Sequence, residues 1–426
     1  MKIKTYKYPD RTLWETIQQR PELDVTSLFD TVQTVLNDVK TNGDEAVRRY
    51  GERFDKVYVA DFQVSEEEII EAERMLSDEL KQAIFTAHRH IEKFHAAQQF
   101  EEIAVETMSG VICRQKAVAI EKVGLYIPGG TAPLFSTVLM LAIPAKIAGC
   151  KEIVLCTPPN REGKAHPAIL FAAKASGISK IFKAGGIQAI GAMTYGTESV
   201  PKVYKIFGPG NQYVVAAKQI VSLKDVAIDM PAGPSEVEII ADESANPAFI
   251  AADFLSQAEH GADSQSVLVT TSESLAEAVK KEITSQLAKL PRRDFAEKSL
   301  SHSCIVILEN EDKMIDFTNQ YAPEHLIIQT ANYTEISARI VNAGSVFLGP
   351  YTPESAGDYA SGTNHTLPTK GYAKMYSGVN LDSFVKKIPF QEITEEGLKE
   401  LGPTIEIMAE AELLEAHKNA VSVRLP

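Results

Sequence analysis

Gln257 and His260 have the types and spacing to hold a metal ion. They stand three residues apart in the run QAEH, and that spacing places both side chains on one face of a helix. An imidazole is a common metal ligand, and an amide oxygen can add to the coordination. The preceding run FIAADFL is apolar nearly all round, so a polar pair at its end must find partners. A capped or hydrogen-bonded histidine is the alternative.

Glu324 and His325 could supply general acid–base chemistry. They lie between Pro323 and the apolar run LII at 326–328, which predicts a strand. An adjacent carboxylate and imidazole can move protons near neutral pH. Because neighbouring residues of a strand point to opposite faces, the two side chains need not touch. A surface loop without chemistry is the alternative.

The segment 349–369, GPYTPESAGDYASGTNHTLPT, is a third candidate. It has no strong secondary-structure pattern, and loops of this length inside compact domains are usually functional or disordered. It is not of low complexity, and Glu354, Asp358 and His365 within it could all bind a metal ion or a substrate. We therefore expect a functional loop here.

Glycine turns follow three apolar runs and indicate a cofactor site. The run GPGN at 208–211 resembles half of a dinucleotide fingerprint, although Tyr213 stands where the third glycine would be. Glycines before a helix leave backbone N–H groups available to a phosphate or a carboxylate. Glycine pairs at 129–130 and 185–186 stand in the same position. Such turns gather at the carboxyl edge of a parallel sheet, where open α/β sheets bind ligands. A tight structural turn is the alternative.

The alternation of apolar runs predicts an α/β protein with two Rossmann-like domains, each an incomplete dinucleotide fold. Residues 117–235 alternate strand-like runs such as VGLYI, EIVLC and KIFK with helix-like runs, which is typical of a mostly parallel sheet. Residues 236–378 repeat the alternation with SEVEIIAD, SVLVTT, SCIVIL, HLIIQ and SVFLG. We expect a mainly helical region at 1–116 and a small helical tail at 379–426.

The N-terminal region contains several local signals. Asn42-Gly43 predicts a break between two helices, and Ser65 with Glu68 predicts a capping box. Residues 102–120 predict a pair of short strands. Three histidines lie among charged residues of a long amphipathic run, and we expect solvated helix faces for all of them: His88, His90 and His95.

The tail is predicted to hold two short helices. Gly402-Pro403 would separate them, and Thr404 could cap the second. Glu412 and His417 stand on the last helix and only roughly share a face. Taken alone, they would belong to an ordinary exposed tail.

Composition and charge restrict the class of protein. A net charge of −14 argues against nucleic acids and anionic membranes as partners. No apolar run approaches the ~20 residues that span a bilayer, and the first residues lack the apolar core of a signal peptide. We therefore expect a cytoplasmic protein. Four cysteines without CxxC spacing predict reduced, mostly core residues: Cys113, Cys150, Cys156 and Cys304.

Taken together, these segments resemble the histidinol dehydrogenase family. The resemblance covers essentially the whole chain, from NGDEAVRRYGERFD to EAHKNAVSVR. The stretches between them are VGLYIPGGTAPLFSTVLMLAIPAKIAGC, KAGGIQAIGAMTYGT, KIFGPGNQYV, IDMPAGPSEV, DFLSQAEHG, YAPEHL and the segment 349–369. The resemblance implies a zinc- and NAD-dependent oxidation of L-histidinol to L-histidine, through bound L-histidinal, with two NAD and one water. This would be the last step of histidine biosynthesis.

The resemblance also implies roles for individual positions. The zinc ligands would be Gln257, His260, Asp358 and His417. The catalytic pair would be Glu324 and His325. Histidinol would be bound by Ser235, Gln257, His260, His325, Asp358, Glu412 and His417. NAD would be bound by Tyr126, Gln188 and Asn211. His365 receives only a possible role on the substrate side.

The same resemblance implies a homodimer with exchanged elements, in which Glu412 and His417 act in the partner's active site. Two alternatives stay open at this point. One is a related NAD-dependent dehydrogenase for another amino alcohol, and the other is an acidic α/β protein that binds a metal or nucleotide without turnover. The Glu324-His325 pair favours an enzyme, and the absence of GxSxG, P-loop and HExxH motifs weakens hydrolase and kinase readings.

Overall fold

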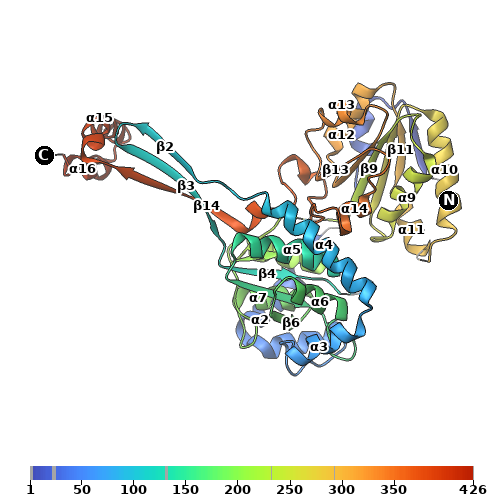
Figure 1. The fold of residues 1–426 in the computed structure, drawn as a ribbon, viewed down its shortest axis with the longest axis horizontal. Helices are drawn as coiled ribbons and strands as arrows, with labels where there is room; N and C mark the ends of the chain where they lie inside the picture. The colour runs from blue at the N-terminus through green and yellow to red at the C-terminus, as the bar shows by residue number, and fades with distance from the viewer. Residues whose placement is uncertain (1–2, 22–24, 130–132, 232, 292, 426) are drawn as a thin grey trace.

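A computed structural model describes residues 3–21, 25–129, 133–231, 233–291 and 293–425. Two parallel sheets, each with its own helices, form the body of the molecule, and a long antiparallel arm leaves it (Figure 1). The predicted fold class, two Rossmann-like α/β units with further helices, is confirmed. The domain boundaries at 117, 236 and 379 stay predictions.

The first sheet has five parallel strands in the order β6-β5-β4-β7-β8. Numbered along the chain this is 3-2-1-4-5, the order of a dinucleotide fold without its last strand. Its strands are β4 (Lys122–Tyr126), β5 (Glu152–Thr157), β6 (Lys180–Lys183), β7 (Lys205–Phe207) and β8 (Ala227–Ile228). Its helices are α5 (Phe135–Ala148), α6 (Pro167–Ala175), α7 (Gly186–Tyr195) and α8 (Gln212–Ser222).

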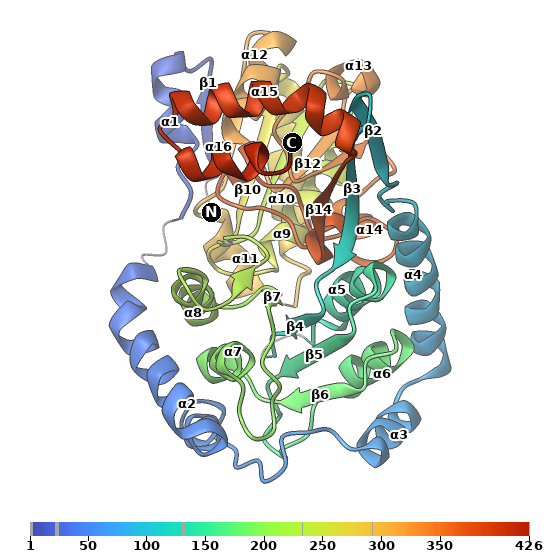
Figure 2. The same cartoon turned by 90° about the vertical axis from the view of Figure 1, so that its left-hand side faces the viewer.

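The apolar runs of this sheet are continuous because both faces are covered. Ile153 and Leu155 of β5 face the layer that contains α5 and α6, whereas Val154 and Cys156 face the layer of α7 and α8. Figure 2 shows two further helices on opposite sides of the sheet, α2 (Phe29–Tyr50) and α4 (Asp78–Ala96). Two apolar layers thus enclose the strands and leave their ends free.

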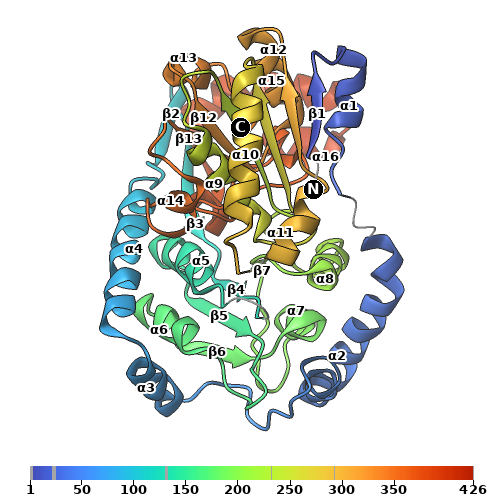
Figure 3. The ribbon, with the colours of Figure 1, turned by 90° about the vertical axis from the view of Figure 1, so that its right-hand side faces the viewer.

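The second sheet has six parallel strands in the order β1-β11-β10-β9-β12-β13. Without β1 this is again 3-2-1-4-5, so the two sheets share one topology. Its strands are β1 (Lys4–Lys7), β9 (Glu236–Ala241), β10 (Gln265–Thr270), β11 (Cys304–Ile307), β12 (His325–Gln329) and β13 (Ser345–Leu348). Its helices are α9 (Pro247–Ala258), α10 (Glu273–Leu287), α11 (Arg293–Leu300), α12 (Glu311–Tyr321), α13 (Tyr333–Ser337) and α14 (Glu354–Tyr359). Figure 3 shows α10 and α11 on one side of the strands.

The N-terminal region is not one helical unit, because its parts join different bodies. Strand β1 pairs with β11, and α1 (Trp14–Ile17) packs under the second sheet through Trp14. After residue 25, α2 packs on α7 and α8, α3 (Glu66–Met75) on α6, and α4 on α5. The predicted helix break is confirmed at Gly43, which has φ +49°, and so is the capping box of Ser65 and Glu68. Short 3-10 or π turns complete the chain at Arg11–Leu13, Val25–Leu28, Gly51–Asp55, Tyr372–Lys374 and Leu381–Phe384.

One of the three expected solvated histidines is buried. His95 has no exposed surface, and its Nδ1 lies 2.9 Å from Gln98 Oε1. The expectation is wrong because the end of α4 packs against α5 and the loop around Asn364, whose Nδ2 lies 3.4 Å from His95 Nε2. Burial lowers the pKa of His95, so the ring is held neutral.

The arm consists of three antiparallel strands in the order β14-β3-β2. They are β2 (Ile103–Met108), β3 (Val111–Ala119) and β14 (Val385–Ile393). The pair at 102–120 is as predicted, but β14 lies in the tail that the sequence analysis describes as helical only. At the far end of the arm, away from both sheets, lie α15 (Glu395–Ala411) and α16 (Glu415–Ser422) (Figure 1).

The predicted separation of the tail helices at Gly402-Pro403 is wrong. Helix α15 runs through both residues and ends before Glu412, where Leu413 has φ +59°. A side chain at Gly402 would lie 2.5 Å from Leu425, so this glycine allows the end of the chain to pack closely on α15. Tertiary packing therefore outweighs the helix-breaking tendency of the Gly-Pro pair.

The other global expectations concern thiols and membranes. All four cysteines are free, and three are buried as expected, whereas Cys113 on β3 is partly exposed. Among the described residues, no helix is both long enough and apolar enough to cross a membrane.

Candidate functional site

The second sheet carries a cluster of charged residues at the amino ends of two adjacent strands. His325 is the first residue of β12, and Glu236 is the first residue of β9. The two strands pair in parallel, with His325 opposite Val237. Glu324, His325 and Glu236 are at most 5% exposed. Buried charges at such an edge must pair with each other or with a bound cation.

Glu324 and Glu236 bind each other's backbone. The Glu236 N–H donates to Glu324 Oε2 at 2.9 Å, and the Glu324 N–H donates to Glu236 Oε1 at 3.3 Å. His325 Nδ1 donates to the Glu236 carbonyl at 3.2 Å and lies 3.6 Å from Glu324 Oε2. Glu324 and His325 thus form no direct hydrogen bond, as the strand geometry predicts, and both are held by Glu236.

Three carboxylates surround the His325 ring. Besides Glu324, they are Glu354, with Oε1 3.8 Å from Nδ1, and Asp358, with Oδ1 3.6 Å from Nε2. Burial alone would lower the pKa of His325, but Glu354, Glu324 and Asp358 more than offset it and raise the pKa well above its usual value. Burial raises the pKa of Glu324 to about 8. His325 and Glu324 can therefore both carry a proton near neutral pH.

A set of metal-ligating groups lies next to His325. One ligand atom each from His260, Glu354 and Asp358 lies within 4.8 Å of the others. Gln257 is fully buried on α9, and neither its Oε1 nor its Nε2 has a hydrogen-bond partner among the described residues. The same holds for both oxygens of Glu354. Unsatisfied buried oxygens beside an imidazole are what a divalent cation would complete.

Two helices bring these groups together. Helix α14 places Glu354 and Asp358 one turn apart, and its first backbone N–H donates to the carboxylate of Asp253 on α9. Gln329 Nε2 also donates to Asp253 Oδ2, at 3.0 Å. Gln257 follows Asp253 by one helical turn and lies on the same face. His260 stands two residues after the end of α9, not within it as the sequence analysis expects.

His365 connects this cluster to the first sheet. Its Nδ1 donates to the Asp358 carbonyl at 2.8 Å, and its Nε2 lies 3.0 Å from the Thr137 hydroxyl on α5. Its pKa is lowered by burial. The loop after α14, which carries His365, therefore links Asp358 to the first turn of α5.

The three predicted cofactor residues line one cavity of about 1340 Å³ at the carboxyl edge of the first sheet. Tyr126 ends β4, and its hydroxyl accepts a hydrogen bond from the Gly186 N–H at 3.0 Å. Gln188 lies in the first turn of α7. Asn211 caps α8, with Oδ1 accepting from the N–H groups of the next turn. The predicted crevice at the glycine turns is confirmed as a cavity. The turns at 185–186 and 208–211 follow β6 and β7, and of the pair 129–130 Gly129 lines the cavity whereas Gly130 lies outside the described residues.

Asp55 is a member of this cavity that the sequence analysis misses. Its Oδ2 accepts a hydrogen bond from Gln188 Nε2 at 3.1 Å, and burial raises its pKa to about 6. It comes from the π-helical turn after α2, far from the glycine motifs in sequence. No local pattern marks such a residue.

The structure does not bring all predicted substrate residues together within one chain. Ser235 precedes β9 at the amino edge, and its carbonyl accepts a hydrogen bond from the Gln265 N–H. Glu412 directly follows α15, not on the last helix as predicted, and His417 lies on α16; both are exposed. These two helices form the tip of the arm, away from α9 and α14 (Figure 1). Within this chain, these two groups therefore lie apart from the cluster.

The sequence gives different signals for Glu236 and Glu354 as members of the charged cluster. Glu236 and Glu238 alternate with apolar residues in SEVEII, and acids in a strand buried on both faces require partners. Glu354 is one of the candidates in the 349–369 segment, but the short helix that pairs it with Asp358 has no clear pattern. The spacing of four residues was the available signal.

Comparison with known proteins shows to which family the chain is similar. The family model described as histidinol dehydrogenase matches residues 18–425. A histidinol dehydrogenase of Bacteroides thetaiotaomicron is 66% identical over 423 residues, 99% of both chains. A chloroplastic histidinol dehydrogenase of Arabidopsis thaliana is 54% identical over 96% of this chain and 88% of its own. The crystal structure of histidinol dehydrogenase from Elizabethkingia anophelis superposes with a TM-score of 0.97 at 56% identity, covering 99% and 98% of the two chains.

Proposed function

Because the chain belongs to the histidinol dehydrogenase family, we propose that the cluster around Asp358 is where it oxidises L-histidinol to L-histidine with NAD, the final step of histidine biosynthesis. The observation that carries this assignment is the meeting of His325 with the metal-ligating group of His260, Glu354 and Asp358. A base and a cation site at contact distance suit the oxidation of an amino alcohol.

The residues present fit a zinc ion. Gln257, His260 and Asp358 would hold it, with the partner subunit's His417 as the fourth protein ligand. Oxygen and imidazole donors without thiolates leave room for a substrate, as in other catalytic zinc sites. A bound zinc ion would orient the substrate, and the cavity of Tyr126, Gln188 and Asn211 would hold NAD, which would supply the hydride acceptor.

His325 would take the alcohol proton in the first oxidation. Its Nδ1 donates to the Glu236 carbonyl, so the neutral ring carries its lone pair on Nε2, which has no hydrogen-bond partner among the described residues. A cation bound at Asp358, next to Glu354, would offset part of the negative charge that raises the pKa of His325. The ring then becomes available as a base.

Glu324 would act in the second oxidation. Water would add to the aldehyde carbon while Glu324 takes one of its protons, which gives the hydrated aldehyde as its mono-anion. By then His325 would have released the alcohol proton to solvent. His325 then removes a hydroxyl proton as the second hydride leaves, and the carboxylate product forms. A carboxyl group with a pKa of about 8 can accept and return a proton near neutral pH.

We also propose a homodimer with shared sites. The arm leaves the body, and its tip carries apolar side chains that are 40–87% exposed: Ile407, Met408, Leu413, Leu414 and Val423. Such a surface is typical of an interface. Docking of the tip on a second copy would bring Glu412 and His417 to that copy's cluster.

The compartment proposed for this chain is the cytoplasm. Its four cysteines are free, which suits a reducing environment. The Arabidopsis relative is named as chloroplastic, so the family is not confined to one compartment.

The direct test of the activity is NADH absorbance with L-histidinol, before and after chelation and zinc return. We expect two NADH per histidinol, loss with the chelator and recovery with zinc. Absence of NADH from zinc-loaded protein would refute the function. Turnover that is unaffected by complete zinc removal would refute the metal assignment.

Subunit mixing tests the shared site. His417→Ala and His325→Asn proteins should each be inactive. After dissociation and reassociation together, mixed dimers should regain part of the activity, because one of their two sites has both groups intact. Mixed dimers that form but stay inactive would exclude action of His417 on the partner.

A further inference from the structure

We propose that Arg20 is a positioning residue for Glu324, acting through Glu236. This inference rests on the proposed function, because it assigns to Arg20 the support of the step in which Glu324 activates water. Arg20 lies far from the catalytic pair in sequence, beside residues 22–24, which are outside the described part of the chain.

Arg20 forms a bidentate ion pair with Glu236. Its Nε and Nη2 donate to the two oxygens of the Glu236 carboxylate, the latter at 2.9 Å. Nη2 also donates to the Tyr321 carbonyl at 2.7 Å, and the guanidinium carbon lies 3.9 Å from the centre of the Tyr321 ring. The side chains of Arg20 and Glu236 are 16% and 2% exposed. The guanidinium group of Arg20 therefore has a fixed position, because its flat face stacks on the Tyr321 ring and its N–H edge binds the Glu236 carboxylate.

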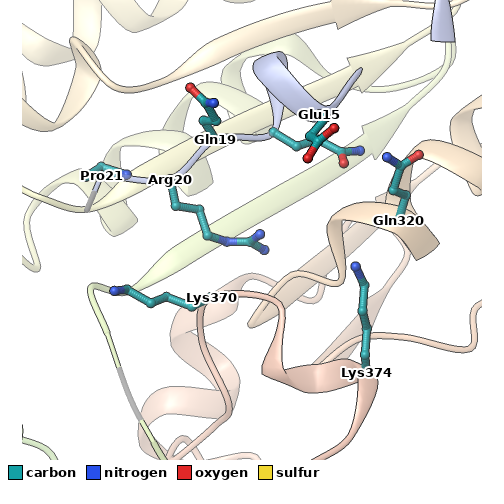
Figure 4. A pocket seen from close by; sticks show the side chains of 8 residues that line it. Glu15, Gln19, Arg20, Pro21, Gln320, Lys370 and Lys374 are labelled. Carbon is teal, nitrogen blue, oxygen red and sulfur yellow. The ribbon is translucent and has the colours of Figure 1, made fainter. Parts of the chain in front are cut away.

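Arg20 lines a polar pocket and also contacts Glu236. Figure 4 shows its side chain leaving the segment of Gln19 and Pro21 and entering this pocket, beside Lys370. Glu236 exchanges backbone hydrogen bonds with Glu324, as described above. A single chain of contacts therefore runs from Arg20 through Glu236 to Glu324.

The physical need for Arg20 comes from two carboxyl groups at one strand edge. A charge on Glu236 raises the pKa of Glu324, adding to the effect of burial. Without the guanidinium, Glu236 would be a buried anion without compensation. It would then tend to move towards solvent. Movement would release the Glu324 backbone N–H, and with it the direction in which Glu324 presents its carboxylate.

Lysine could not replace this arrangement fully. The guanidinium offers parallel N–H groups that match both carboxylate oxygens, and its flat face stacks on Tyr321. An ammonium group keeps the charge but holds the carboxylate at one point. Arg20→Lys should therefore retain the charge compensation and lose part of the positioning.

The test compares the two half-reactions in zinc-loaded enzyme. In Arg20→Met, we expect L-histidinal oxidation to fall by roughly 100-fold, the lower end of a general base contribution. Production of the first NADH in a single turnover with histidinol should fall much less, and zinc content should stay near wild type. Arg20→Lys should recover part of the aldehyde oxidation. Equal losses in both half-reactions would indicate a merely structural role and overturn the proposal.

A sharper comparison is between Glu236→Gln and the double variant Glu236→Gln/Arg20→Met. It does not require that the single variant Arg20→Met folds. Replacing both partners of a buried ion pair is often tolerated. Once Glu236→Gln has removed the anion, adding Arg20→Met should change aldehyde oxidation by less than about 3-fold, since interacting sites are not additive. If the double variant instead shows the full loss on top of that of Glu236→Gln, Arg20 does not act through the Glu236 charge.

Two matched controls separate this role from general effects. Arg11→Met removes another arginine of the same N-terminal segment, one that pairs at the surface with Asp316. Lys370→Met removes a cation that lines the same pocket. Both should keep wild-type ratios of the two half-reactions, and a selective loss in either would overturn the assignment to Arg20. Wild-type turnover with histidinol tests the proposed function separately, so an active wild type with the wrong variant pattern rejects only this inference.

Discussion

The two parallel sheets have the same strand order and place their functional residues at opposite edges. In the first sheet, the carboxyl ends of β4 and β7 face the cavity that contains Tyr126 and Asn211. In the second sheet, a hydrogen bond links the segments that follow the carboxyl ends of β9 and β12: Asp242 Oδ2 accepts from the Ala331 N–H at 2.9 Å. There the amino ends carry the chemistry, with Glu236 and His325 as first residues.

The difference shows what a shared topology does and does not determine. A switch point between neighbouring strands creates a crevice at the carboxyl edge of a parallel sheet. In the first sheet, backbone turns and mostly neutral side chains line this crevice. The second sheet builds its site from buried charges, which must compensate one another in a low-dielectric setting. Substitutions in the second site should therefore have larger effects than substitutions in the first.

The largest effect is expected at His325. In His325→Asn, turnover should fall by roughly 100- to 10,000-fold because the base is lost, while the amide can still donate to the Glu236 carbonyl. Zinc content, measured by elemental analysis, should stay near wild type. Parallel loss of zinc and activity would place His325 among the ligands and not beside them.

Glu354 should give the next largest effect, on metal retention. Glu354→Gln keeps the shape but removes a negative charge next to His260 and Asp358, so zinc affinity should fall by roughly 10- to 100-fold, as for other groups that support metal ligands. Competition with a chelator measures this, and excess zinc should restore much of the activity. Glu335→Gln on α13, an exposed acid of the same sheet, is the control. Unchanged affinity in Glu354→Gln would remove Glu354 from the metal site.

The two sites also differ in how far the sequence predicts them. The strands, their order of appearance and the glycine turns of the first sheet follow from local patterns, and the cavity lies where those turns indicate. At the second site, local patterns identify Gln257, His260 and the Glu324-His325 pair as candidates. Their assembly depends on α14, on strand pairing and on Glu236. Such long-range contacts leave no periodic signal in a single sequence, and the same reason hides Asp55, Arg20 and β14.

A smaller effect is expected in the first site. Gln188→Ala removes a neutral hydrogen-bonding group from the cavity, so the KM for NAD should rise by roughly 3- to 10-fold, the range of one or two hydrogen bonds. Zinc content and the KM for histidinol should not change, because Gln188 belongs to the first sheet. Steady-state kinetics with each substrate varied in turn measure both values. A rise confined to the histidinol KM would contradict the separation of the two sites.

The smallest effect concerns stability and Asp55, a carboxyl group of the first site whose pKa is raised. Asp55 has a folded-state pKa of about 6, above the ordinary value of 3.8 that it has in the unfolded chain. The folded state therefore binds more protons between these values, and the stability that Asp55 contributes falls as pH rises from about 4 to 6. Above pH 6 the ionised carboxylate in the cavity carries its full cost.

Asp55→Asn should remove this cost and keep an acceptor oxygen for Gln188. At pH 4 the variant and wild type should unfold alike, and above pH 6 the variant should be more stable, by no more than about 1–2 kcal/mol because Asp55 is partly exposed to water. Urea unfolding at pH 4, 5, 6 and 7.5 measures the difference, with Asp61→Asn, an exposed acid nearby, as the control. A difference that is constant across this range would mean that the cavity does not raise the pKa of Asp55. The contrast between the cavity of the first sheet and the buried charges of the second sheet would then be sharper still.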